Sequence, residues 1–380
     1  RYNELLDGLR ENVTLRETDL SAGTVPEDAD MLLVVGPEDI DEKQVFALDQ
    51  FLMQGGSLVL AASPYHVDLG GQAISARKQA TGLEDWLAHM GLTLEPTLVL
   101  DLQSTPFPIP VQRQVAGFVV EEIQTLAYPY FPDIRSDGMD EETGITPGLG
   151  QITLNWASPI RVDAEKNEHR RVIELLRSSP ASWTDESEDI QPDFQAHGEY
   201  GFAVGEETGP RTLAVAVEGR FGSFFAGKSS PLLEPAGGDE DAEGDETGGE
   251  EASGSNPVFS GVVESSPASA KLILVGSASF LSDTAISLAT EATRTLYTKP
   301  VEFIQNTVDW SLEDRGLLDL RGRGQYSRLL EPLDRNGQMF WEYLNYALAM
   351  GGLALVYWLY RRSRLKRQRN YETLMSVGRD

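Results

Sequence analysis

The sequence contains no cysteine among its 380 residues. Thiol catalysis is therefore excluded, and so are disulfide bonds that could brace a small domain. An absence of cysteine suits a domain on the extracytoplasmic side of a membrane, although composition of this kind does not by itself assign a compartment.

Histidine is also scarce, and the residues His66, His89, His169 and His197 lie far apart in the sequence. None belongs to an H-E-x-x-H motif or to another paired ligand spacing, so each is expected to have a structural or surface role. The nucleotide-binding patterns GxGxxG and GxxxxGK[ST] are absent as well. Any nucleotide hydrolysis linked to this protein must then take place on another chain.

Positive charge is in short supply: 31 Lys and Arg face 60 Asp and Glu, for a formal net charge of −29. Such an acidic surface argues against nucleic acid as a partner and against lying flat on an anionic leaflet. The chain opens with RYNELLDGLREN, which reads like the middle of a helix, and is expected to be a segment of a longer or processed polypeptide.

The longest apolar run is Met339–Tyr360, which has Trp and Tyr near both ends and the basic residues of 361–369 directly after it. About twenty apolar residues match a ~30 Å hydrocarbon core. With the aromatic belts and the positive-inside bias, the run predicts a transmembrane helix. The basic tail 361–380 would be cytoplasmic, and the bulk of the chain would lie outside the inner membrane. The alternative is a buried core helix with a solvated basic end.

Acidic residues and glycine dominate 234–257, EPAGGDEDAEGDETGGEEASGSNP, which lacks aliphatic and aromatic core formers. This composition predicts a disordered insert. Calcium binding is the functional alternative, but the spacing does not match an EF-hand loop. The predicted organisation is therefore one α/β domain at 1–330 that carries this insert, a linker at 331–338, and then the membrane segment 339–360.

The clearest structural unit begins with the short apolar run Met31–Gly36, which suits a buried parallel strand. Asp41 and Gln44 then form a capping box, and the apolar residues that follow share one helical face. Ser57–Pro64 is a second buried strand. Strand, helix and strand with short connections predict a right-handed βαβ unit.

Further elements are predicted around this unit from apolar runs and breaker residues. Expected helices cover 2–9, 82–90 and 292–312, the last with a fresh start at Pro300. Residues 102–150 are expected to be loops around one strand at 117–120. The other expected strands are 13–19, 98–101, 152–156, 172–176, 212–217, one that opens 271–283 before a small-residue turn, and a final one in LLDLRGRG, 317–324.

Several of these stretches, in this order, resemble the GldG-type gliding-motility auxiliary components, a family of ABC transporter auxiliary proteins. The stretches are MLLVVGPEDIDEKQVFALDQFLMQGGSLVLAASP, GLEDWLAHMGLTLEPTLVLD, VIELLRSSPASW, LAVAVEGRFGSFF, LILVGSASFLSD and FIQNTVDWSLEDRGLLDLRGRG. The resemblance covers roughly 1–360. It implies a flavodoxin-like or class I amidotransferase-like parallel-sheet fold, with a related non-catalytic domain in intraflagellar-transport scaffolds. It also implies an ABC-2-type permease and a separate cytoplasmic ABC ATPase as partners.

An amidotransferase relative would place cysteine on a strand-to-helix elbow, and this chain has none. The elbow candidates here are Ser63 and Ser279, and neither lies in a G-x-S-x-G motif. Ser63 with His66 is the best nucleophile–base pair, but a histidine three residues away cannot easily serve an elbow serine. Gly36–Asp39 follows a predicted strand, where doubly wound folds place ligands.

The sequence therefore predicts a non-catalytic, membrane-anchored auxiliary subunit of an ABC-2-type transport complex. No catalytic, cofactor-binding or metal-binding residue is assigned, and no cofactor is expected. The alternatives are a degenerate amidotransferase-like hydrolase that uses Ser63 or Ser279, and a purely structural envelope scaffold.

Overall fold

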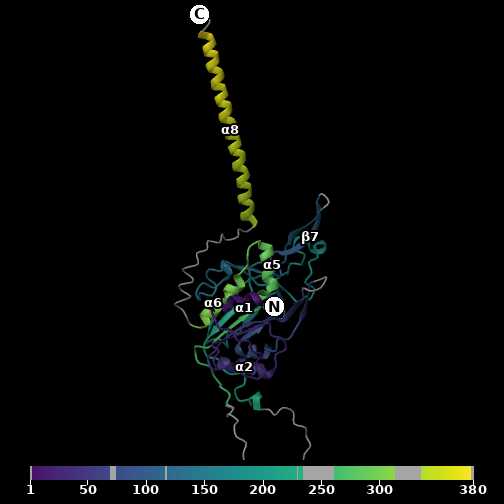
Figure 1. The fold of residues 1–380 in the computed structure, drawn as a ribbon, viewed down its shortest axis with the longest axis vertical. Helices are drawn as coiled ribbons and strands as arrows, with labels where there is room; N and C mark the ends of the chain where they lie inside the picture. Colours follow the sequence, from purple (N-terminus) through teal and green to yellow (C-terminus); the bar gives the residue numbers. More distant parts are fainter. Residues whose placement is uncertain are drawn as a thin grey trace, which may run out of the picture. The chain divides into compact units, whose positions relative to one another are not determined.

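The computed structural model describes residues 2–68, 74–115, 118–228, 230–233, 261–312 and 335–377. The chain divides into two units, Arg1–Ser327 and Arg328–Asp380 (Figure 1). The predicted acidic insert 234–257 and the predicted strand 317–324 lie outside the described residues, as do residues 331–334 of the predicted linker 331–338.

The first unit contains helices and strands throughout its described length. Its α-helices are α1 (Asn3–Arg10), α2 (Glu42–Met53), α3 (Glu84–Met90), α4 (Phe194–His197), α5 (Asp283–Thr293) and α6 (Lys299–Ser311). Its strands are β1 (Met31–Val35), β2 (Ser57–Ala61), β3 (Tyr65–Asp68), β4 (Ser75–Lys78), β5 (Leu92–Leu94), β6 (Leu98–Asp101), β7 (Phe107–Val115), β8 (Phe118–Leu126), β9 (Asp133–Arg135), β10 (Gln151–Thr153), β11 (Ile160–Val162), β12 (Arg171–Arg177), β13 (Ser182–Asp185), β14 (Thr212–Glu218) and β15 (Lys271–Val275).

A five-stranded sheet in the order β1-β2-β15-β14-β12 forms the centre of this unit. The first three strands are parallel to one another. Strand β14 runs antiparallel to them, and β12, which pairs antiparallel with β14, runs in the same direction as the first three. The predicted flavodoxin-like or class I amidotransferase-like parallel sheet is therefore wrong, because the sheet is mixed. Apolar runs such as Thr212–Val217 indicate that a strand is buried but carry no information about its direction.

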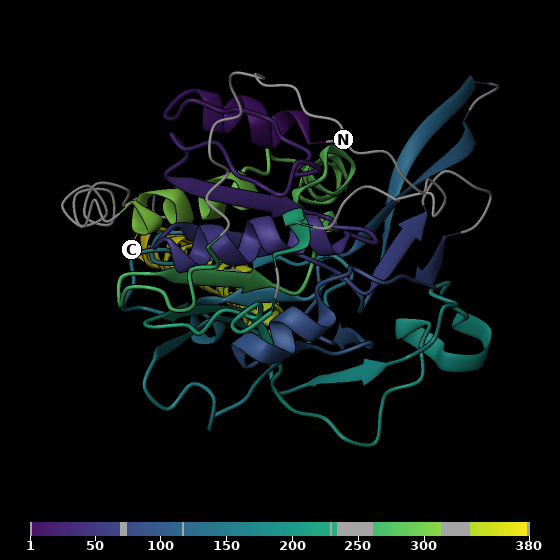
Figure 2. The same cartoon turned by 90° about the horizontal axis from the view of Figure 1, so that it is seen from below.

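Alternate residues of the central strands enter two separate apolar cores. Leu58 and Leu60 of β2 lie in the core beneath α2 and α3, whereas Val59 and Ala61 lie in the core beneath α1 and α6. Successive side chains of a strand point to opposite faces, so a strand covered on both sides must be apolar throughout. The result is a three-layer α/β/α arrangement (Figure 2).

The predicted βαβ unit is confirmed. Strands β1 and β2 pair in parallel with Met31 opposite Ser57, and α2 connects them. The capping box is present, since the Asp41 side chain accepts from the Gln44 N–H and the Gln44 side chain accepts from the Asp41 N–H. After α2, Gly55 adopts a positive φ of 94°, which turns the chain back toward β2.

The edge of the sheet at β1 differs from the prediction. Residues 13–19 form no strand, and Leu33 and Val35 are only half-buried, although burial on both faces is predicted for them. The reason is topological: β1 is the last strand of the sheet, so only β2 covers it. Leu58 and Leu60, one strand further in, are fully buried as predicted.

Small two-stranded sheets surround the central one, among them β13-β6, β10-β9 and β11-β5. The region 102–150, predicted to be mostly loop, contains the long β7–β8 hairpin with Phe107 opposite Leu126. This hairpin extends away from the central sheet in both views (Figures 1 and 2). Its Pro108 and Pro110 had favoured loop over strand, but a proline is tolerated in a strand at a sheet edge.

The second unit contains the long helix α8 (Arg335–Val377). No described helix is both long enough and apolar enough to cross a membrane. The predicted transmembrane helix 339–360 is therefore wrong, and the inner-membrane location and sidedness that rested on it are overturned too. The run is interrupted by Glu342, Asn345 and Gly351–Gly352, and much of its remainder is Tyr and Trp. Tyr and Trp suit a membrane interface but add little to the mean hydropathy of a helix. The length of the run 339–360 therefore overstated its apolarity.

The packing of α2 on the sheet predicts the cost of truncating one of its side chains. Leu48 is fully buried in the core that contains Leu58 and Leu60. Leu48→Ala should lower the free energy of unfolding by about 2–5 kcal/mol, because it leaves a cavity that the layers on either side cannot close. Urea denaturation followed by circular dichroism measures this loss. Leu296→Ala is the control, since Leu296 is 78% exposed; an equal loss in both variants would contradict the assigned packing.

Candidate functional site

The carboxyl ends of the three parallel strands meet at one edge of the sheet, where open α/β sheets bind ligands. The Gly36 N–H donates to the Ala61 carbonyl oxygen, and the Ala62 N–H donates to the Val275 carbonyl oxygen. A methyl group added at Gly36 would come 3.2 Å from the Tyr2 hydroxyl oxygen. The predicted ligand-binding turn at Gly36–Asp39 is thus closely approached by the start of α1.

Ser63 and His66, the best predicted nucleophile–base pair, point to different partners. Ser63 is buried and its Oγ accepts a hydrogen bond from the Tyr65 N–H at 3.2 Å. The His66 Nδ1 lies 3.1 Å from Oε1 of Glu38, and both of these side chains are substantially exposed. Among the described residues, no hydrogen bond joins the serine to the histidine, so this serine lacks the adjacent base that an activated nucleophile needs.

Ser279 and its neighbour Ser277 lie after β15 and share one acceptor. Their hydroxyl groups donate to the carbonyl oxygen of Asn155, at 3.0 Å and 2.7 Å. Ser277 is fully buried. Both hydroxyl protons are therefore committed to fixing the loop that contains Asn155, which is a structural use of these side chains.

The remaining histidines do not gather. The His89 Nε2 lies 3.1 Å from the Gly222 carbonyl oxygen, and its ring contacts Phe224 edge-on. His197 ends the short helix α4, and His169 lies in the turn before β12. Within the described ranges, no three or more His, Asp or Glu side chains are grouped so as to hold a metal ion.

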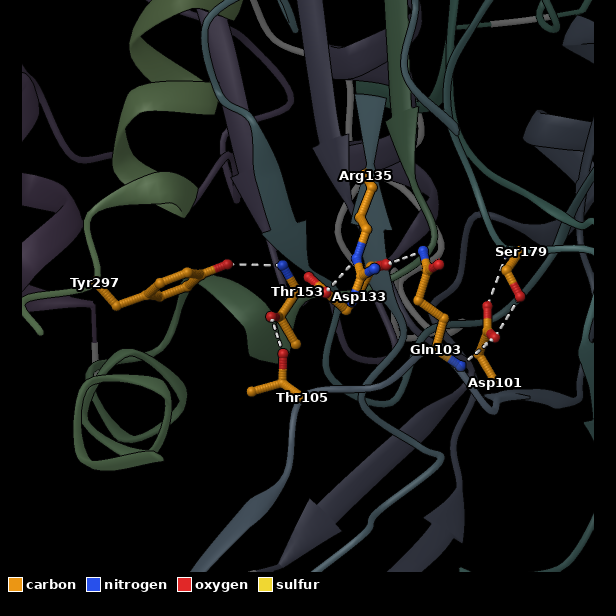
Figure 3. A network of polar contacts seen from close by, with 8 residues as sticks. All are labelled: Asp101, Gln103, Thr105, Asp133, Arg135, Thr153, Ser179 and Tyr297. Carbon is orange, nitrogen blue, oxygen red and sulfur yellow. Dashed lines mark hydrogen bonds and ion pairs between the residues drawn. The ribbon is translucent and has the colours of Figure 1, made fainter. Parts of the chain in front are cut away.

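A buried polar network, which the sequence analysis missed, lies beside the central sheet (Figure 3). Its first part centres on Asp101, the fully buried last residue of β6. The Asp101 carboxylate accepts from the N–H and the Oγ of Ser179 at 2.8 and 2.6 Å, and from the Gln103 N–H at 2.8 Å. Burial raises the pKa of Asp101, and these hydrogen bonds oppose that rise.

The second part of the network centres on Asp133 at the start of β9. Gln103 Nε2 donates to the Asp133 carbonyl oxygen at 2.7 Å, and Arg135 Nε lies 3.2 Å from its Oδ2. No described donor reaches its Oδ1. Burial raises the pKa of Asp133 to about 6, against a smaller opposing effect of Arg135. Nearby, Thr105 and Thr153 share a hydrogen bond of 2.7 Å, and the Thr153 N–H donates to the Tyr297 hydroxyl.

This network connects the ends of β6, β9 and β10 to the turn before β13 and to the segment before α6 (Figure 3). Its groups contact one another and the backbone, which is the arrangement of a structural clamp. A usable sequence signal was the acidic residue that ends the apolar run Leu98–Asp101: a carboxylate in that position must find donors inside the fold.

A third buried carboxylate, Asp49 in α2, holds the loop after β14. It accepts from Trp86 Nε1 at 3.1 Å, from Ser223 Oγ at 2.6 Å and from the Phe224 N–H at 3.0 Å. The loop GRFGSFF is thereby fixed against α2 and α3, and its position depends on the buried carboxylate of Asp49.

A groove of about 860 Å³ lies beside β1. The whole of β1 lines one part of it, and the extended segment Val13–Leu20 lines another. Val13, Leu15 and Val25 contribute apolar surface, and Glu17 and Asp30 contribute acidic groups. Sequence analysis had filled this region with a predicted strand at 13–19, so the groove became visible only in the tertiary structure.

The fold and these sites together define an α/β domain with a mixed sheet, buried structural carboxylates and no assembled catalytic group among its described residues. The chain belongs to the family described as "ABC-type uncharacterized transport system", whose model matches residues 1–307. It is thus an auxiliary component of an ABC-type transport system. The family level of the sequence resemblance is confirmed; the narrower GldG-type name is not.

Among solved structures, the chain is similar to the mmIFT52 N-terminal domain, at 11% sequence identity and a TM-score of 0.40. That alignment covers 82% of this chain and 90% of the other. No curated protein matches the chain.

The burial of Asp133 predicts a pH-dependent contribution to stability. Its folded pKa of about 6 lies above the unfolded value, so the folded state holds a proton that the unfolded state has released between about pH 4 and 6. Stability from this group should therefore be complete in acid and fall by ~3 kcal/mol as the pH rises through 6.

Asp133→Asn removes the titration while keeping an oxygen that Arg135 can reach. Urea unfolding of both proteins at a series of pH values measures the effect, because subtracting the two curves cancels the contributions of other groups such as Asp101. The expected difference grows in favour of the variant between about pH 4 and 6 and levels off above that range. A difference that stays constant over the whole series would refute the elevated pKa.

Proposed function

We propose that this chain is a non-catalytic auxiliary subunit that works by binding, with residues 1–330 as the auxiliary domain. In this proposal it contacts an ABC-2-type permease or the material that the permease moves, and a separate ABC ATPase hydrolyses the nucleotide. The observation that carries the proposal is the family match over residues 1–307, nearly the whole of that domain.

The chemistry of the candidate residues supports a binding role over catalysis. The hydroxyl groups of Ser277 and Ser279 donate to a backbone carbonyl oxygen, and the Ser63 Oγ accepts from a backbone N–H. The only imidazole near Ser63 in sequence, that of His66, pairs with Glu38. A hydrolase would need one of these serines next to a base that itself is oriented by a third group.

The partnership is tested by purifying the tagged full chain from its native host after mild crosslinking and identifying the proteins that come with it. An ABC ATPase and a multi-helix permease should be enriched over a strain that expresses the tag alone. Enrichment of envelope proteins without either transport component would favour the structural scaffold instead, and would count against the proposal.

Substitution of the elbow serines separates binding from hydrolysis. Ser63→Ala and Ser279→Ala should both leave the transport or motility phenotype unchanged, because neither hydroxyl is activated. Leu48→Ala supplies the matched reference, since its phenotype should follow the amount of folded protein. Loss of function in Ser63→Ala at normal protein levels would replace the binding subunit with the hydrolase alternative.

A further inference from the structure

The open edge of β1 has backbone groups available for pairing. Successive residues of a parallel strand direct their N–H and C=O groups to opposite edges. Because the Gly36 N–H bonds to Ala61 of β2, residues 32 and 34 also face β2, whereas Leu33 and Val35 direct their backbone groups away from it. That outward side is the groove, and no described backbone group pairs with β1 there.

The opposite edge of the same sheet shows how an edge is normally protected. Strand β12 carries the charged residues Arg171, Glu174 and Arg177, and its pairing with β14 contains register shifts after Glu174. Charges and bulges of this kind prevent another strand from adding to an edge. Strand β1 reads MLLVV and has neither feature, so it retains a flat, apolar edge of the kind that accepts a further strand.

The groove beside β1 has the shape and surface that an added strand requires. It follows all five residues of β1, and Val13, Leu15 and Val25 offer apolar surface for side chains on the added strand. The segment Val13–Leu20 is held in place by polar contacts: Arg16 makes a bidentate ion pair with Asp28, and Gln44 donates to the Asp19 carbonyl oxygen.

The charge of the groove indicates which charged side chains the added strand has. Four carboxylates line it, those of Glu17, Asp19, Asp28 and Asp30, against the single guanidinium of Arg16, which is already paired with Asp28. The surplus is negative, in a chain whose net charge is −29. Lys or Arg on the incoming strand would be attracted, and an acidic strand would be repelled.

We propose that this groove binds one extended strand of a partner protein, which pairs with the backbone of Leu33 and Val35. The strand is apolar at alternate positions and carries Lys or Arg beside them. Main-chain hydrogen bonds then supply affinity, and the apolar and acidic linings supply specificity. This inference rests on the proposed function only in assuming that the strand belongs to a partner protein. Its test uses the purified chain alone.

The test begins with a library of random dodecapeptides displayed on phage and selected on the full chain. Enriched peptides should alternate apolar and polar residues, contain Lys or Arg, and lack proline in their central part. Failure to enrich any peptide, or enrichment of acidic or proline-rich ones, would overturn the proposal.

The best enriched peptide, labelled with a fluorophore, then locates the site. Leu15→Asp should weaken binding by about tenfold or more, since it places a charge against the apolar side of the strand. Val172→Asp on β12 is the matched control, because it puts the same charge at the other edge of the sheet. Equal affinity in the two variants would show that the peptide binds elsewhere.

Two further measurements protect this result from a folding artefact. Glu17→Lys combined with Asp30→Lys changes only exposed side chains, so the fold should be kept. This double variant should bind the basic peptide with lower affinity, and its binding should depend less on salt concentration. If Leu15→Asp fails to fold, the double variant decides; unchanged affinity there would contradict the assigned charge recognition.

Hydrogen exchange of the Leu33 and Val35 amides completes the test. Both should exchange rapidly in the chain alone and slowly with the peptide bound. Slow exchange before any peptide is added would overturn the proposal, since the groove would already be filled. If the slow exchange then depended on protein concentration, a second copy of the chain would be filling the groove. If it did not, a segment of the same polypeptide would be filling it. Whichever result is found, co-purification with transport proteins is judged separately, so the two proposals fail independently.

Discussion

The structure of the first unit depends on burying the central strands of its sheet on both faces. Strands β2, β15 and β14 have apolar side chains in both cores, and their residues are almost completely shielded from water. This requires α2 and α3 on one side and α1 and α6 on the other, each with an apolar face of its own. Hydrophobic burial on this scale is the dominant favourable term in folding, so the helices are held where the strands need them.

Buried polar groups then fix the loops and strand ends that the apolar layers do not hold in place. Asp49 holds the loop after β14 against α2, while Asp101 and Asp133 hold strand ends of the smaller sheets together. Lys271 at the start of β15 points under the end of α6 and donates to the Trp310 carbonyl oxygen. Each of these groups is costly to bury unless its partners are in place, and so each specifies one arrangement of the loops.

The same constraints distinguish the two places where this fold could bind something. At the carboxyl ends of the parallel strands, the chain's own groups approach closely and use the hydroxyls of Ser277 and Ser279. At β1 the sheet ends without a charged or bulged edge, beside a groove that Val13–Leu20 borders at a distance. For a protein that binds a partner and does not catalyse a reaction, the groove beside β1 is the more suitable binding place of the two.

The sequence alone determined the local units. Capping residues, a 3.6-residue period and two short apolar runs identify β1–α2–β2, because these signals act within a few residues of one another. The family was also recognisable from ordered motifs. Length and flanking charges suggested a membrane span at Met339–Tyr360 that the apolarity of the helix does not support.

Only the tertiary structure decided how the strands pair and which residues far apart in the sequence come into contact. An apolar run does not state the direction of its strand, so the antiparallel pairing of β14 with both β15 and β12 could not be foreseen. Nor does it state which strand ends the sheet, and for that reason Leu33 is half-buried while Leu58 is fully buried. Asp101 meets Ser179, 78 residues later, only through the folded chain. Such contacts arise from the way the layers pack, and no local pattern encodes them.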